Sequence, residues 1–205
     1  MGLSRRKSDA ADRPRCKARR VDHRPRAVLV VGAQAAGKSS VARQLAARFD
    51  RGAFIEGDLL WKMVVAGAVD MSGAPDAEAD RQLALRYRHG AMLAESFVAE
   101  GFTAVHAENM FGSMVEQHLR SLRCPRALVV LRPRPEVIEE RDRLRATDSY
   151  RPWIPAGGSV LEAIRLFDSW IGDIARLGVW IDSSDLTIEQ TVDQILGRWH
   201  ETIVD

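Results

Sequence analysis

Residues 32–39 read GAQAAGKS and carry residue types that together can hold a phosphate chain. The segment matches G-x-x-x-x-G-K-[ST] at every defined position. Small residues let the backbone form a concave nest of N–H groups, and Lys38 adds a positive charge for the β- and γ-phosphates. Ser39 offers a hydroxyl to Mg²⁺. We predict a triphosphate-binding loop whose residues are Gly32, Ala33, Gln34, Ala35, Ala36, Gly37, Lys38, Ser39 and Ser40.

Acidic side chains follow two further apolar segments of the chain. Asp58 comes after AFIEG, and Glu108 and Asn109 come after FTAVHA. Ligands bind at the carboxyl ends of parallel strands, so Asp58 can orient an acceptor hydroxyl or accept its proton. Asp58 can also be a helix N-cap. We predict Ser39 and Glu108 as magnesium ligands, the alternative for Glu108 being a solvated loop carboxylate, and we expect His106 to be packed within its strand.

Arginines are concentrated in EERDRLRATDSYRP, residues 139–152. Arg141 and Arg145 are four residues apart, so on a helix they share a face. On a lid they can clamp phosphates and offset charge during transfer. The alternative is a solvated face paired with neighbouring acidic residues, and Arg143 points elsewhere. We predict Lys38, Asp58, Arg141 and Arg145 as the catalytic residues.

The acceptor-binding part of the site is less constrained by the sequence. Apolar side chains in and after residues 61–90 can build an apolar pocket for a drug-like acceptor, or can simply be core: Trp61, Met63, Met71, Tyr87 and Phe111. Arg86 and Arg88 can instead meet an anionic substrate. These alternatives stay open at this point.

Short apolar runs alternate with segments of helical periodicity from residue 27 onward. Such alternation predicts an α/β fold with a parallel sheet between two helical layers. The predicted strands are 27–32, 53–56, 102–107, 126–131 and 178–182. The predicted helices cover 38–49, a segment from near Leu59, 76–100, 135–145, a segment ending at Leu177 and one starting at Thr187. Residues 146–158, rich in proline and glycine, are expected to form a lid loop.

The chain has 205 residues, a net charge of +2 and two cysteines. This length suits one domain, and so few cysteines fit a reduced, cytoplasmic setting. No apolar run is long enough to span a membrane, so we expect no membrane partner. Residues 1–26 hold ten Lys/Arg and three Asp. We expect them to form a basic, disordered arm, which can alternatively contact nucleic acid, before a domain at 27–205.

The motifs together resemble those of small P-loop kinases. The loop GAQAAGKS, the segments EGD and EGFTAVHAENMFG, the two arginines and WIDSSDLTIEQTVDQIL are similar to the chloramphenicol phosphotransferase-like family, over residues 27–196. This resemblance implies transfer of the γ-phosphoryl group from ATP, with Mg²⁺, to a hydroxyl, and it implies that Asp58 is the catalytic base. The family tends to present paired Asp residues where this chain has Glu108 and Asn109.

The sequence therefore predicts a P-loop kinase that phosphorylates a hydroxyl of a small molecule, with an antibiotic as the candidate acceptor. The chain lacks a strong Walker B aspartate after an apolar strand and the NKxD motif of GTPases, which disfavours a motor or a switch. Two alternatives remain: a polynucleotide or nucleotide kinase, and a nucleotide-dependent regulatory module without an acceptor. The sequence does not define the oligomeric state.

Overall fold

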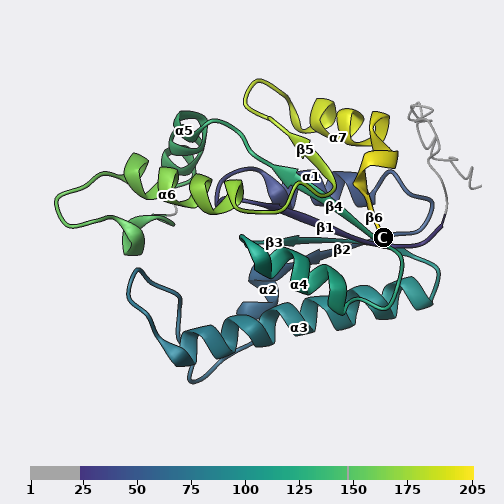
Figure 1. The fold of residues 1–205 in the computed structure, drawn as a ribbon, viewed down its shortest axis with the longest axis horizontal. Helices are drawn as coiled ribbons and strands as arrows, with labels where there is room; N and C mark the ends of the chain where they lie inside the picture. Colours follow the sequence, from purple (N-terminus) through teal and green to yellow (C-terminus); the bar gives the residue numbers. More distant parts are fainter. Residues whose placement is uncertain (1–23, 147) are drawn as a thin grey trace, which may run out of the picture.

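The computed structural model describes residues 24–146 and 148–205 (Figure 1). The predicted basic arm therefore lies outside the described residues, apart from its last three positions. Within the described part, no helix combines the length and apolar character that a membrane crossing requires.

A parallel sheet forms the centre of the fold. Its strands are β1 (Ala27–Gly32), β2 (Gly52–Glu56), β3 (Thr103–Glu108), β4 (Arg126–Leu131) and β5 (Val179–Ile181), in the order β2-β3-β1-β4-β5. A short β6 (Ile203–Val204) pairs antiparallel with the start of β4. This order and these pairings confirm the predicted five-stranded parallel sheet. The sequence indicated the strands because continuous apolar runs are typical of strands covered on both faces.

Helices cover both faces of the sheet and extend past one end of it. They are α1 (Lys38–Ala46), α2 (Gly57–Trp61), α3 (Ala77–Ala99), α4 (Ser113–Ser121), α5 (Pro135–Arg145), α6 (Val160–Gly172) and α7 (Ile188–Gly197), with 3₁₀ turns at Arg151–Trp153 and Trp199–Thr202. Figure 1 shows α1 and α7 on one face and α2, α3 and α4 on the other, while α5 and α6 reach beyond the carboxyl ends of the strands.

Alternate residues of β1 anchor two separate cores. Val28 and Val30 pack with residues of α1 and α7, whereas Leu29 and Val31 pack with residues of α2, α3 and α4. A third cluster lies among α5, α6 and the segment between them, where Phe167 packs beside the buried Tyr150. The Tyr150 hydroxyl donates to the carbonyl of Gln34 at 2.8 Å, so this segment is tied to the loop at residues 32–39.

Most helix boundaries match the sequence-based expectations, with four differences. Helix α1 ends at Ala46 rather than at Phe49, α6 ends at Gly172 rather than at Leu177, and α4 was not expected at all. Helix α2 begins at Gly57, so Asp58 lies in its first turn and is not the N-cap. The predicted capping box at Thr187 and Gln190 is confirmed at the start of α7.

Gly90 of α3 faces the ring of His106 on β3. His106 is 2% exposed, as expected for a packed histidine. A Cβ atom at residue 90 would lie 2.2 Å from Cε1 of that ring. We expect Gly90→Ala to lower the free energy of unfolding by about 1–3 kcal/mol through overpacking, although alanine favours helix by about 1 kcal/mol.

Urea denaturation measures this effect, with Gly197→Ala in α7 as the matched control. A Cβ at residue 197 meets no atom within 4 Å, so the control should keep or slightly raise the stability. Equal stability of the two variants would show that α3 moves away from His106 at little cost.

Candidate functional site

The loop at residues 32–39 has the backbone shape of an anion-binding nest. Ala35 and Gly37 adopt positive φ values of 58° and 96°, and the Ala36 N–H donates to the Ala33 carbonyl. Gly32 allows close approach to β4, because a Cβ there would lie 2.5 Å from the Leu131 carbonyl oxygen. No side chain caps the start of α1, so its first N–H groups can bind an anion.

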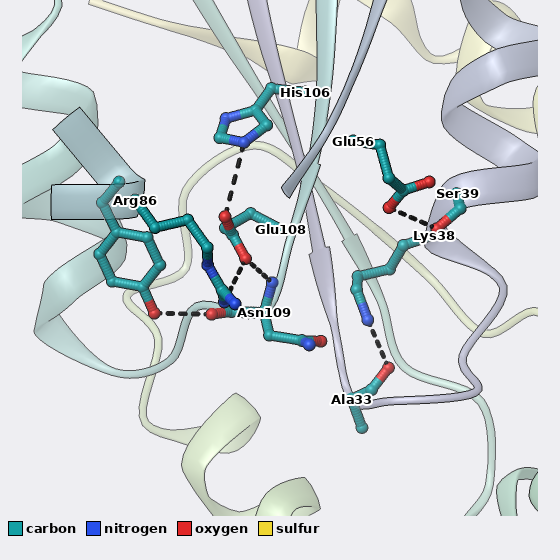
Figure 2. Close-up of polar contacts among 9 residues, drawn as sticks. Ala33, Lys38, Ser39, Glu56, Arg86, His106, Glu108 and Asn109 are labelled. Atoms are coloured by element: carbon teal, nitrogen blue, oxygen red, sulfur yellow. Dashed lines mark hydrogen bonds and ion pairs between the residues drawn. The ribbon is translucent and has the colours of Figure 1, made fainter. Parts of the chain in front are cut away.

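Lys38 lies at the centre of this loop with 9% of its surface exposed. Its Nζ donates to the Ala33 carbonyl at 2.8 Å (Figure 2). Burial lowers the pKa of Lys38 to about 8, although the charges of Asp58, Glu108 and Glu56 act in the opposite direction. The ammonium group is therefore held within electrostatic range of all three carboxylates.

Ser39 meets a carboxylate that the sequence analysis did not single out. Its hydroxyl donates to Oε1 of Glu56 at 2.9 Å (Figure 2). Glu56 is the last residue of β2, and its burial raises the pKa of its carboxyl group. The sequence EGD did hold a signal for this role, because its glutamate is the last residue of a predicted strand and so lies at the edge of the sheet where ligands bind. A hydroxyl and a carboxylate at this separation are oxygen donors of the kind that Mg²⁺ prefers.

Asp58 lies in the first turn of α2. Together with Lys38 and Ser39 it lines a cavity at the carboxyl ends of the strands. The side chain is exposed, and among the described residues no hydrogen bond or ion pair engages its carboxylate. The carboxylate is therefore available to a hydroxyl group that enters the cavity.

Glu108 is differently placed from the expectation of a magnesium ligand. It is the last residue of β3, its side chain is 1% exposed, and Oε1 accepts from Nη2 of Arg86 at 2.6 Å and from the Asn109 N–H at 2.8 Å (Figure 2). Oε2 is also buried. Gly57 lies close against it, because a Cβ atom built on that residue would be 2.3 Å from Oε2. The alternative of a solvated loop carboxylate is wrong, because this side chain is buried. The geometry supports Glu56, rather than Glu108, as the partner of Ser39.

The two arginines of α5 lie in different surroundings. Arg145 lines the cavity with Lys38. Arg141 donates instead to the backbone carbonyls of Ala36, at 3.4 Å, and Ser183, at 2.9 Å. Of the two side chains, Arg145 lines the cavity and Arg141 contacts the loop backbone, so a phosphate clamp built from both arginines stays a prediction. Arg143 pairs with Glu140 at the surface, as its position on the helix indicated.

These groups converge on a cavity of about 210 Å³ at the carboxyl ends of the strands. Polar and charged side chains dominate its lining, among them Gln34, Lys38, Ser39, Glu56, Asp58, Glu108, Asn109, Arg145 and Ser149.

The side chains that could have built an apolar pocket, left open against a core role, do not line this cavity. Met63 is 70% exposed, the Tyr87 hydroxyl donates to the Asn109 carbonyl, and Phe111 packs against Phe167. None of these three, nor Trp61 or Met71, lines the cavity.

Comparison with solved structures identifies the same fold in two kinases and a resistance protein, among others. A sugar kinase from Janibacter sp. HTCC2649 aligns with a TM-score of 0.53 at 18% identity, over 85% of this chain and 92% of that one. A gluconokinase from Sinorhizobium meliloti 1021 gives 0.56 at 18%, over 87% and 92%. The tunicamycin resistance protein of Deinococcus radiodurans gives 0.56 at 18%, over 89% and 99%. Among curated proteins, no significant match was found.

A family model also matches the chain directly. The model is described as an AAA domain, and it covers residues 28–164. That span starts in β1, contains the phosphate-binding loop and all the cavity-lining residues, and ends in α6. Because the match covers well over half of the chain, this protein belongs to the AAA_33 family of AAA domains.

Proposed function

We propose that this protein is an ATP- and Mg²⁺-dependent kinase that transfers the γ-phosphoryl group to a hydroxyl of a small molecule. The observation that carries the proposal is the position of Asp58, whose unengaged carboxylate shares one cavity with the phosphate-binding loop and with Lys38. A switch or motor needs only the loop and a water-positioning group. A carboxylate open to the cavity at the end of a neighbouring strand fits an acceptor alcohol.

The proposed reaction follows from these positions. The loop amides and Lys38 hold the triphosphate, and Arg145 offsets charge on the transferring group. The Ser39 hydroxyl and the Glu56 carboxylate fit Mg²⁺, which would neutralise phosphate charge. Asp58 orients the acceptor hydroxyl and takes its proton as the new O–P bond forms and the bond from the γ-phosphorus to the bridging oxygen breaks. ADP leaves with that oxygen.

The acceptor class is proposed more broadly than an antibiotic alone. The resemblance to chloramphenicol phosphotransferase-like proteins and the shared fold of a tunicamycin resistance protein support an antibiotic alcohol. The polar cavity and the shared fold of a sugar kinase support a polyhydroxylated molecule. Both classes belong in the test.

ADP release from Mg·ATP tests the proposal across hydroxylated antibiotics, sugars, nucleosides and 5′-hydroxyl oligonucleotides. Release that depends on one acceptor class and on Asp58 would establish a kinase and name its acceptor. Slow release that no acceptor stimulates, equal in wild type and Asp58→Asn, would instead favour a regulatory nucleotide-binding module.

The lowered pKa of Lys38 predicts a pH dependence of nucleotide binding. A triphosphate prefers the protonated ammonium, so affinity should fall as the pH rises through about 8, where the free protein loses that proton. From about pH 7.5 to about pH 9.5 we expect the Kd for Mg·ATP to rise about tenfold or more. Isothermal titration calorimetry measures this. Lys38→Arg is the control, because a guanidinium stays charged over this range; a flat wild-type profile contradicts the prediction.

A further inference from the structure

The charges around the cavity constrain the acceptor, and this inference rests on the proposed function. From the distribution of those charges we infer that the acceptor is an uncharged or ammonium-bearing alcohol and not a carboxylate or phosphate ester. Among residues 24–146 and 148–205, no free cation lies in the cavity lining beside Asp58 to receive an anionic group, whereas a hydroxyl or ammonium group meets oxygen atoms that lack donors.

Among the described residues, the cations that line the cavity are Lys38 of the loop and Arg145 at the end of α5. In the proposed reaction both engage the triphosphate, and Glu56, which accepts a hydrogen bond from Ser39 of the loop, would hold Mg²⁺ together with it. The carboxylate left to meet the acceptor is that of Asp58. An anionic acceptor beside Asp58 would therefore meet a like charge and no free cation of the described lining. Like charges a few ångströms apart in a partly buried site repel strongly.

Arg86 is the further cation that reaches this region from α3, and it is already neutralised. Its Nη2 lies 2.6 Å from Oε1 of Glu108, and the two side chains are 13% and 1% exposed. Breaking a buried pair of this kind leaves an uncompensated charge, so the pair is a poor source of a cation for substrate. Arg88, two residues along α3, is exposed and does not line the cavity. The alternative of an arginine-bound anionic substrate therefore finds no support in these contacts.

Asn109 adds an observation that is independent of charge. Its backbone N–H donates to Glu108 and its carbonyl accepts from the Tyr87 hydroxyl at 2.6 Å, which fixes the residue at the cavity wall. Its Oδ1 is buried without a hydrogen-bond partner. Figure 2 shows the amide directed away from Arg86 and towards the side on which Lys38 lies. A buried carbonyl oxygen without a donor favours a ligand that supplies one, such as a hydroxyl or an ammonium group.

The test compares acceptors that share a hydroxyl scaffold and differ in charge. D-glucose, D-glucosamine and D-gluconate form one series, and a nucleoside and its 3′-monophosphate form another. Chloramphenicol, an aminoglycoside and a 5′-hydroxyl oligonucleotide extend the range. The readout is kcat/KM from ADP release. We expect the neutral or amino member to exceed its anionic counterpart by at least about tenfold, and the ratio to shrink at high salt.

Two variants separate the cavity charges from the general surface charge. Asn109→Asp adds a carboxylate of nearly equal size at the cavity wall, and it should move the preference further towards the amino member. Arg88→Gln removes an exposed charge outside the cavity and should leave the ratio unchanged.

An anionic acceptor that equals or exceeds its neutral counterpart overturns the inference and leaves the kinase proposal standing. The same holds if the oligonucleotide is the best acceptor. If no acceptor of any charge stimulates Asp58-dependent ADP release, the proposed function itself fails, and this inference fails with it.

Discussion

Replacing Lys38 with alanine is expected to remove nearly all phosphoryl transfer. The side chain occupies the centre of the loop, and its ammonium is buried there, held at 2.8 Å from the Ala33 carbonyl. A buried charge aimed at developing negative charge acts in a medium of low dielectric constant, where its contribution is large. Loss of one such donor costs about 10²–10³-fold in kcat, and we expect kcat/KM of Lys38→Ala to fall by at least that factor.

The folded state should survive this substitution. Burial disfavours the charged form of Lys38, as its lowered pKa shows, so removing the ammonium relieves a desolvation cost. Thermal unfolding should therefore change little while ADP release disappears. Lys62→Ala, at the exposed end of α2, is the matched control and should keep full activity. Comparable activity of the Lys38 and Lys62 variants would contradict a phosphate-binding role for the loop.

The sheet could be predicted from the sequence because its signal is local. Each central strand is a continuous apolar run, such as AVLVVG in β1 and ALVVL in β4, and burial on both faces requires that pattern. The phosphate-binding loop was equally accessible, since its glycines and Lys38 occupy fixed offsets between a strand and a helix. Pro135 at the first turn of α5 and the capping box of α7 placed two helix starts correctly.

Helix α4 was missed for a local reason as well. It is only nine residues long, and its buried side chains, Val115, His118 and Leu119, form a narrow stripe that includes a histidine. Short helices depend mainly on tertiary packing, which periodicity over one or two turns indicates weakly.

The side chains of the site were harder to assign because their partners lie far away in the chain. Arg86 and Glu108 are 22 residues apart, and Ser39 and Glu56 are 17 apart. From the sequence, Glu108 was predicted as the magnesium ligand and Asp58 as the base, and Glu56 was not singled out. The register of β2 beside β3 sets Glu56 next to Ala107. This register distinguishes Glu56, which reaches Ser39, from Glu108, which Arg86 neutralises.

Asp58→Asn is expected to lower kcat by about 10²–10⁴-fold while leaving the affinity for Mg·ATP nearly unchanged. An amide of the same shape can still accept a hydrogen bond from the acceptor hydroxyl, but it cannot take the proton. Nucleotide affinity should persist because the loop, Lys38 and the Ser39–Glu56 pair are untouched. Single-turnover transfer and calorimetry with a nonhydrolysable ATP analogue separate the two quantities.

Asp70→Asn is the matched control for this loss. Asp70 lies in the exposed segment between α2 and α3 and does not line the cavity, so the same change of charge there should leave kcat intact. A normal kcat in Asp58→Asn would exclude Asp58 as the proton acceptor, and it would direct attention to Glu56, another carboxylate that lines the cavity. A loss of Mg·ATP affinity that matches the loss of kcat would instead place Asp58 in nucleotide or metal binding, because a group that acts only on the acceptor proton does not change nucleotide affinity.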